Sequence, residues 1–357
     1  MEKTSHKEFS KSETDLAGDL LRNSLSTEEE KNNALKILSY WRAAHSYPMH
    51  IFKKRLKNVS EKIDKSALSA QRLKRVPSII KKLNRSYGGN KPTMKLTQMQ
   101  DIAGCRVVMS NVKLANQLYQ EYYLKGDLKH KKVNEKNYII FPKTDGYRSI
   151  HLVYRYSSDK GKKAYNGLLV EVQIRSKLQH LWATAVETVD FFTSQAIKSN
   201  EGQKEWVDFF RLVSSAFAQF ENSPIVPGTP ENKKELCSLI REKEKELQVR
   251  TKMSHWTNTI RQFDQLKNKT KAQFFLLELD TIQEKLTISS YSKRNEQKAI
   301  SDYADAEKRI YGKKEYDVVL VGADSTRDLK KAYPNYFLDT REFLVYLDKI
   351  LRDVTKP

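Results

Sequence analysis

The chain has 357 residues, enough for two domains and a sizeable core, and it carries 65 Lys and Arg against 44 Asp and Glu, a net charge of +21. No run of about 18 apolar residues is present, so a membrane span is excluded. The charge favours polyanionic partners such as nucleic acids, nucleotides or an acidic membrane face, although a solvated basic surface has the same composition. The polar N-terminus lacks the apolar segment of a secretion signal, so we expect a cytoplasmic protein.

The cysteine content argues in the same direction. Cys105 and Cys237 are the two cysteines, and each lies in an apolar run. This count excludes a disulfide framework and a cysteine-rich zinc site, and it is typical of a reducing cytoplasm. We therefore expect no zinc.

The N-terminal part is predicted to be helical after a loose lead at residues 1–24. A capping box follows, in which either Ser26 or Thr27 pairs with a glutamate three residues later. Apolar residues then recur at helical spacing until Pro48 interrupts the pattern.

Two basic clusters are candidates for contact with nucleic acid. The first lies in a predicted helix at residues 51–63, and the second lies in a predicted loop at residues 128–132. Their basic side chains are Lys53, Lys54, Arg55, Lys57, Lys129, Lys131 and Lys132. Because charge runs are usually solvated surfaces, this assignment depends on the function of the rest of the chain.

An extended segment followed by a helix that begins near Pro77 predicts a phosphate site. Arg72 and Lys74 project to one side of the extended part, and Ser78 and Lys82 share a face of the helix. Cations, a hydroxyl group and a helix N-terminus then converge on one place, as in a polyphosphate site without a glycine-rich loop. An ordinary basic surface helix is the alternative.

Residues 101–109 predict a buried strand with Asp101 at its start and Arg106 inside it. An arginine in an apolar run requires an anionic partner. A carboxylate at a strand end beside a phosphate site is a suitable Mg²⁺ ligand, although aspartates at turns and helix caps are common.

The most informative stretch is a predicted hairpin of two strands, residues 150–156 and 168–175, preceded by a short strand at 137–141 and a turn signal at 142–146. Apolar residues occupy one face of the second strand, and polar residues occupy the other. Polar side chains on one face of a central strand are costly unless they line a site. The candidate site residues are Tyr147, Arg148, His151, Glu171, Gln173 and Arg175.

The second half begins with helices and changes character near residue 270. Helices are predicted from Gln179 and at 206–220, and a Pro-rich break at 223–230 precedes a charged helix at 233–250. A small α/β module is then predicted, and a final helix begins near residue 340. Its predicted strands are 274–279, 286–291 and 316–321, with a helix at 294–311.

Four motifs, in this order, resemble the synthetase domain of the RelA/SpoT family over roughly residues 35–220. They are Arg72-x-Lys74-x-x-x-Ser78-Ile-x-x-Lys82, Asp101-Ile-Ala-Gly-Cys-Arg106, Gly146-Tyr-Arg-Ser-Ile-His151 and Glu171-Val-Gln-Ile-Arg175. The resemblance implies an α+β fold, with a mixed β-sheet flanked by helices, and a nucleotidyltransferase-like synthetase. Since no counterpart of the family's hydrolase domain is found, a single activity is expected.

The resemblance also implies a role for each candidate. The residues expected to bind ATP are Arg72, Lys74, Ser78, Lys82 and Arg106. Asp101 and Glu171 would hold Mg²⁺, Glu171 would also activate the acceptor hydroxyl, and Tyr147 would stack on the acceptor base as an exposed side chain. The residues expected to support the acceptor or the phosphates are Arg148, His151, Gln173 and Arg175.

The C-terminal module ends in Tyr333-Pro-Asn-Tyr336. A small synthetase followed by a short module with this ending resembles the CapRel family of fused toxin–antitoxins of phage defence. This resemblance implies pyrophosphate transfer from ATP to the 3′ CCA end of tRNA, and autoinhibition by a pseudo-zinc-finger module through Tyr333 and Tyr336. A phage major capsid protein would release the toxin, and the result would be abortive infection. We expect the enzyme to be a monomer. The implied boundaries are a toxin domain at 1–222, a linker and anchoring helix at 223–269, the antitoxin module at 270–336 and a C-terminal anchoring helix at 337–357.

Two alternatives remain open. The acceptor could instead be a free nucleotide, giving (p)ppGpp or ppApp, although Glu187-Thr188 stands where many alarmone-making members carry Glu-His. A catalytically silent RNA-binding regulator is the rival from another class. The presence of Asp101, Tyr147 and Glu171 argues against it.

Overall fold

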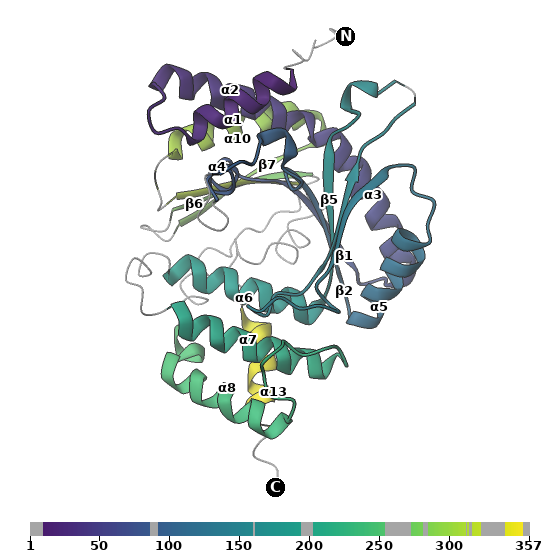
Figure 1. The fold of residues 1–357 in the computed structure, drawn as a ribbon, viewed down its shortest axis with the longest axis vertical. Helices are drawn as coiled ribbons and strands as arrows, with labels where there is room; N and C mark the ends of the chain where they lie inside the picture. Colours follow the sequence, from purple (N-terminus) through teal and green to yellow (C-terminus); the bar gives the residue numbers. More distant parts are fainter. Residues whose placement is uncertain are drawn as a thin grey trace.

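A computed structural model describes residues 10–85, 92–159, 161–193, 203–253, 273–280, 285–311, 313, 316–322 and 340–352. These residues form a mixed β-sheet flanked by helices, which confirms the predicted fold class (Figure 1). The helices are α1 Lys11–Arg22, α2 Glu28–Ala44, α3 Ser46–Ile63, α4 Val76–Leu83, α5 Val112–Leu118, α6 Lys177–Thr193, α7 Gln203–Phe220, α8 Lys233–Leu247, α10 Glu296–Ile310 and α13 Arg341–Arg352. The strands are β1 Leu68–Leu73, β2 Ala103–Met109, β3 Lys131–Asn137, β4 Ile150–Arg155, β5 Leu169–Ser176, β6 Phe274–Asp280, β7 Lys285–Tyr291 and β8 Tyr316–Gly322.

One continuous sheet joins the two halves of the chain. Its strand order is β3-β4-β5-β2-β1-β8-β6-β7, and β2 and β5 are parallel whereas the other paired strands are antiparallel. The strands of the predicted C-terminal module therefore extend the N-terminal sheet through β8, which pairs with β1. Nothing in the local sequence pattern predicted this pairing.

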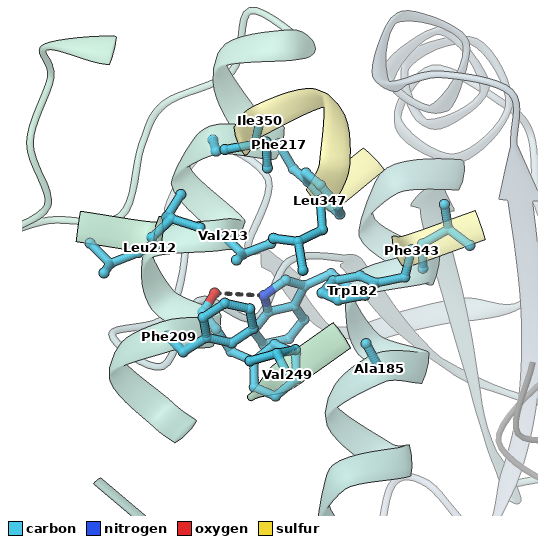
Figure 2. Close-up of a cluster of buried hydrophobic side chains, with 14 of the residues drawn as sticks. Trp182, Ala185, Phe209, Leu212, Val213, Phe217, Val249, Phe343, Leu347 and Ile350 are labelled. Atoms are coloured by element: carbon cyan, nitrogen blue, oxygen red, sulfur yellow. Dashed lines mark hydrogen bonds between the residues drawn. The ribbon is translucent and has the colours of Figure 1, made fainter. Parts of the chain in front are cut away.

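Helices cover the sheet in separate groups (Figure 1). α3 and α5 pack on one face of β1, β2, β4 and β5, where aliphatic and aromatic side chains form a core. α1, α2 and α4 share a second core, and α10 covers β6 and β8 with a smaller one. A further core lies between α6, α7, α8 and α13, where Trp182 donates its ring N–H to the carbonyl oxygen of Phe210 at 2.7 Å (Figure 2).

The predicted loose lead at residues 1–24 is wrong, because α1 occupies half of it. Ser10 and Glu13 form a reciprocal capping box, a signal that the sequence contains. The buried stripe of α1 consists of Thr14, Ala17, Gly18 and Leu21. Two of these residues are small and one is polar, so the stripe lacks the hydrophobicity by which a helix is usually recognised.

The boundary between the next two helices lies at His45, three residues before the expected one. Pro48 occupies the first turn of α3, where a missing backbone N–H costs no hydrogen bond. Of the two possible capping boxes, the one observed joins Thr27 to Glu30.

The strand predicted at residues 137–141 is also wrong. The strand is β3, which begins at Lys131, near the end of the predicted basic loop, and ends at Asn137. β3 lies at the edge of the sheet and its side chains are exposed or half-buried. Edge strands commonly carry charged residues, and so they lack a clear apolar alternation.

Candidate active site

The site is built on the face of β5 that carries its polar residues. In the sheet His151 of β4 lies opposite Gln173, and Glu171 lies opposite Gly104 of β2. Because side chains alternate along a strand, Glu171, Gln173 and Arg175 share one face. The predicted grouping of polar residues is thus present.

Glu171 is held at both carboxylate oxygens. His151 Nδ1 lies 2.7 Å from one oxygen, and the Gln173 side-chain amide donates to the other at 2.7 Å. Burial would by itself raise the pKa of Glu171, but the hydrogen bonds from His151 and Gln173 outweigh burial and lower this pKa below its usual value. Glu171 is therefore ionised and oriented at neutral pH.

Tyr147 continues this network. Its hydroxyl lies 2.7 Å from His151 Nε2 and accepts a hydrogen bond from Arg175. His151 thus contacts Glu171 through one ring nitrogen and Tyr147 through the other. The result is a continuous line of polar side chains from Glu171 to Arg175.

The expectation that Tyr147 is exposed is wrong, since its side chain is half-buried. The ring meets Tyr138 and Trp182 edge to face, with centroids 5.9 and 6.4 Å away. The Lys143 ammonium and the Arg175 guanidinium each lie 5.0 Å from the ring centroid. The sequence reasoning missed Tyr138, which lies in the strand predicted at 137–141, and Lys143, which lies in the predicted turn.

The turn that carries Tyr147 requires a glycine. Gly146 has a φ of +94°, and a Cβ at this position would lie 2.9 Å from Ser214 Cβ and 3.0 Å from Trp182 Cζ2. The Asp145 side chain accepts the backbone N–H of Tyr147 at 2.9 Å, as in an Asx turn. The Asp-Gly pair therefore sets the direction in which Tyr147 leaves the turn.

Asp101 forms the second charged centre. Its two oxygens accept hydrogen bonds from Lys74 Nζ at 3.0 Å and Lys82 Nζ at 2.9 Å. Burial would raise the pKa of Asp101, but the two ammonium groups outweigh it and lower that pKa. The charge of Asp101 acts on Glu171 and raises the pKa of Glu171, so the two carboxylates belong to one electrostatic site.

The predicted phosphate residues lie on β1 and α4 around this carboxylate. Arg72 lies between Gly104 of β2 and Val321 of β8 in the sheet, and its charge acts on Lys74. Ser78 is half-buried in the first turn of α4. The strand-then-helix arrangement predicted for this segment is present, with Pro77 at the start of the helix.

Two arginines extend the site along β2 and β5. Arg106 Nε and Arg175 Nη2 both donate to the side-chain oxygen of Gln173 at 3.3 Å. Arg175 is 3% exposed, and its Nε and Nη1 atoms are buried without a hydrogen-bond partner among the described residues. Buried polar atoms are usually hydrogen-bonded, so these two nitrogens are exceptions within the described residues.

Arg148 lies outside this network. It is buried, and its Nε donates to Ser214 Oγ at 2.9 Å while the Ser214 hydroxyl donates to the Gly146 carbonyl at 2.6 Å. Burial lowers the pKa of Arg148 to about 10, against the opposing charge of Glu221. Its contacts fasten the glycine turn to α7, which is a structural role that the sequence reasoning did not anticipate.

The two segments that carry the basic clusters pack together through the buried rings of Phe52 on α3 and His130, with centroids 4.7 Å apart. The prediction that Lys53 lies on a surface that contacts RNA is corrected, because its side chain is only 8% exposed. Arg55 and Lys57 are half-buried. The exposed members of the clusters are Lys54, Lys129, Lys131 and Lys132, the last of which pairs with Glu135.

Several expectations concern residues outside the described part of the chain. Tyr333 and Tyr336 are among them, so their autoinhibitory role stays a prediction. Within the described ranges, no group of three or more His, Cys, Asp or Glu is arranged to hold a metal ion. None of the described helices has the length and apolar character that crossing a membrane requires.

The carboxylates of the site nevertheless suit Mg²⁺. This ion is commonly bound by one or two carboxylates together with substrate phosphates and water, so it does not need a complete protein cage. Asp101 and Glu171 supply two ionised carboxylates in one electrostatic site, beside cations that phosphates could contact.

Part of the chain that contains this site matches a known protein family. Residues 71–191 match the region found in RelA / SpoT proteins. Over 122 residues the chain is 33% identical to the GTP pyrophosphokinase YjbM of Bacillus subtilis (strain 168), a stretch that covers 34% of this chain and 54% of that protein. The chain thus spans about half the length of the curated relative that it matches.

Similar solved structures include two small alarmone synthetases from Bacillus subtilis. Small alarmone synthetase 1 bound to its product pppGpp is 24% identical, with 52% of this chain and 94% of that chain covered and a TM-score of 0.44. Small alarmone synthetase 2 is 20% identical, with 51% and 93% covered and a TM-score of 0.42. The residues from Arg72 to Arg175 all fall within residues 71–191, the part of the chain that matches the region found in RelA / SpoT proteins.

Proposed function

We propose that the chain is a pyrophosphokinase that transfers the β,γ-diphosphate of ATP to a ribose 3′-hydroxyl. The observation that carries this proposal is the polar line from Glu171 through His151 and Tyr147 to Arg175, beside an Asp101 carboxylate held by two lysines. Group transfer of this kind depends on positioning and on neutralising charge, and the site offers both.

The reaction can be written with these side chains. The acceptor 3′-oxygen bonds to the β-phosphorus of ATP, the bond from that phosphorus to the α,β-bridging oxygen breaks, and AMP leaves. Glu171 is placed to take the hydroxyl proton, since it is ionised and oriented by His151 and Gln173. Asp101 and Glu171 would hold Mg²⁺, which when bound would neutralise the phosphate charge.

The cationic side chains would hold the donor. Lys74 and Lys82 now bind Asp101, and they are free to bind phosphates instead once a metal neutralises that carboxylate. The other residues proposed to bind ATP are Arg72, Ser78 and Arg106. Tyr147 is proposed to stack on the acceptor base.

For the acceptor we propose the 3′ CCA end of tRNA. The net charge of +21 and the exposed basic residues Lys54, Lys129 and Lys131 favour an extended polyanion. A free guanine nucleotide is the second candidate, and the name of the 33% identical relative, a GTP pyrophosphokinase, favours it. That reaction would give (p)ppGpp; an adenine acceptor would give ppApp.

We further propose that the C-terminal module restrains the enzyme through Tyr333 and Tyr336, and that a phage major capsid protein relieves the restraint in abortive infection. The pairing of β8 with β1 beside Arg72 supports control of the ATP site by this module.

The test supplies γ-labelled ATP to the full chain with tRNA, GDP, GTP or ATP as separate acceptors, with and without candidate capsid proteins. Label on the 3′ end of tRNA is expected. Label on free nucleotides alone would select the second candidate, and no transfer to any acceptor in the chain carrying Tyr333→Ala and Tyr336→Ala would reject the enzyme proposal. Glu171→Gln is the inactive control.

A further inference from the structure

The N-terminus of α4 is capped by a side chain from the far end of the sequence. Arg75, which precedes the helix, makes no side-chain cap. Glu307 of α10 accepts the backbone N–H of Val76 at 2.8 Å, across a separation of 231 residues. The C-terminal half thus supplies the cap of the helix that carries Ser78 and Lys82.

The same carboxylate belongs to a buried ion pair. Arg42 of α2 donates to the second oxygen of Glu307 and to the hydroxyl of Tyr303, and its guanidinium lies 4.7 Å from the Tyr303 ring centroid. Arg42 is 3% exposed and Glu307 is 6% exposed. The Tyr303 hydroxyl donates to Glu307 as well, so the carboxylate is fixed from three sides.

The cap matters because α4 is short. A helix of 8 residues is marginal by itself, and a carboxylate at its first N–H opposes fraying and interacts favourably with the helix dipole. Lys82, near the other end of α4, forms one of the two bonds to Asp101. The position at which α4 begins therefore determines where Lys82 and Ser78 lie relative to Asp101.

We propose that Glu307 is a positioning residue for the ATP site, which acts through the Val76 N–H and α4 and touches no substrate. This inference rests on the pyrophosphokinase function proposed above. The C-terminal module then contributes to the ATP site by completing it, in addition to any restraint that the module exerts.

The rival explanation is that Glu307 only neutralises Arg42. Replacing both partners of a buried ion pair with apolar residues is often neutral or stabilising, whereas removing one partner is destabilising. Two double variants separate the roles. Arg42→Met with Glu307→Met removes both charges and the cap, and Arg42→Met with Glu307→Gln removes both charges but keeps a carbonyl oxygen for the Val76 N–H.

The variants are compared in the full chain carrying Tyr333→Ala and Tyr336→Ala, so that restraint by those residues is absent. We expect the Met/Met variant to match its parent in kcat, to raise the KM for ATP about fivefold, and to lose hydrogen-exchange protection across 76–83. The Met/Gln variant should restore both the KM and the protection. Glu278→Gln, which breaks an exposed ion pair with Arg309 on the same module, is the matched control and should change neither quantity.

Equal KM values and equal exchange in the Met/Met variant and its parent would overturn the proposal and leave Glu307 as half of an ion pair. The exchange readout does not depend on catalysis. If the parent shows no transfer to any acceptor, the proposed function fails, and the exchange comparison of the two double variants still decides whether Glu307 caps α4.

Discussion

The polar line from Glu171 to Arg175, which is mostly half-buried, and the buried junction of α2, α4 and α10 are both networks of polar and charged residues, and they are specified in different ways. In the first, the bonds from Glu171 to Arg175 join residues within 28 positions of one another. In the second, Arg42 and Glu307 are 265 positions apart. The first network is encoded in one hairpin, whereas the second forms only when the whole sheet has assembled.

From this difference we expect substitutions at the junction of α2, α4 and α10 to lower the free energy of unfolding more than they lower the rate of transfer. Arg42→Met leaves the Glu307 carboxylate buried without its cation, which should lower the free energy of unfolding by about 3 to 5 kcal/mol. Chemical denaturation of the full chain measures this loss. A loss below about 1 kcal/mol would mean that water or another cation satisfies Glu307.

Substitutions in the polar line from Glu171 to Arg175 should lower the rate of transfer more than they lower stability. His151→Ala removes the contact to Glu171 and the contact to Tyr147, so we expect the rate of transfer to fall about a hundredfold with little change in Tm. Single-turnover kinetics with saturating ATP measures the rate. An unchanged rate would show that the orientation of Glu171 does not depend on His151.

Gly146→Ala tests the turn on which the hairpin network depends. The positive φ and the contacts a Cβ would make with Ser214 and Trp182 should cost about 1 to 3 kcal/mol of stability. Thermal unfolding measures this loss, with Gly161→Ala as the control variant. Gly161 also has a positive φ, but a Cβ there would meet no atom within 4 Å, so its variant should lose less.

A comparable effect is expected at Ser214, which bridges Arg148 and the Gly146 carbonyl. Ser214→Ala removes both bonds and should destabilise the chain by about 1 to 3 kcal/mol. The KM for the acceptor should rise if the turn loosens. Stability and KM that both stay at the parent value would contradict the bridging role.

The smallest change in Tm with pH near neutrality is expected for Asp101, the carboxylate bound by Lys74 and Lys82. Because the folded-state pKa of Asp101 is lowered, its stabilisation is complete above the ordinary pKa of 3.8 and is lost as the pH falls through the lowered value. The Tm difference between the parent and Asp101→Asn should thus be constant from pH 7 to pH 5 and shrink below about pH 4. A difference that already shrinks at pH 6 would contradict this assignment.

Much of the site could be predicted because its signals are local. Alternation along β5 placed Glu171, Gln173 and Arg175 on one face, and Pro77 marked the start of α4. Arg148 was misjudged, since the same short motif that places Tyr147 in the network turns the next side chain toward α7.

The remaining errors arise where tertiary contacts decide. Lys53 lies in a basic run that looks exposed, yet its helix face is buried. β3 has the sequence of a loop and becomes a strand by pairing with β4 at the sheet edge. The cap from Glu307 to Val76 has no signal in either segment, since each residue is ordinary in its own helix.

The pairing of β8 with β1 has a consequence for any shortened version of this protein. β8 covers one side of β1 at Gln71 and Arg72, and β2 covers the other. Removing the C-terminal strands would turn β1 into a sheet edge with free N–H and C=O groups, a surface on which a second copy can add a strand. The separated N-terminal half is therefore expected to self-associate, and substitutions within the intact chain are the cleaner way to study its catalysis.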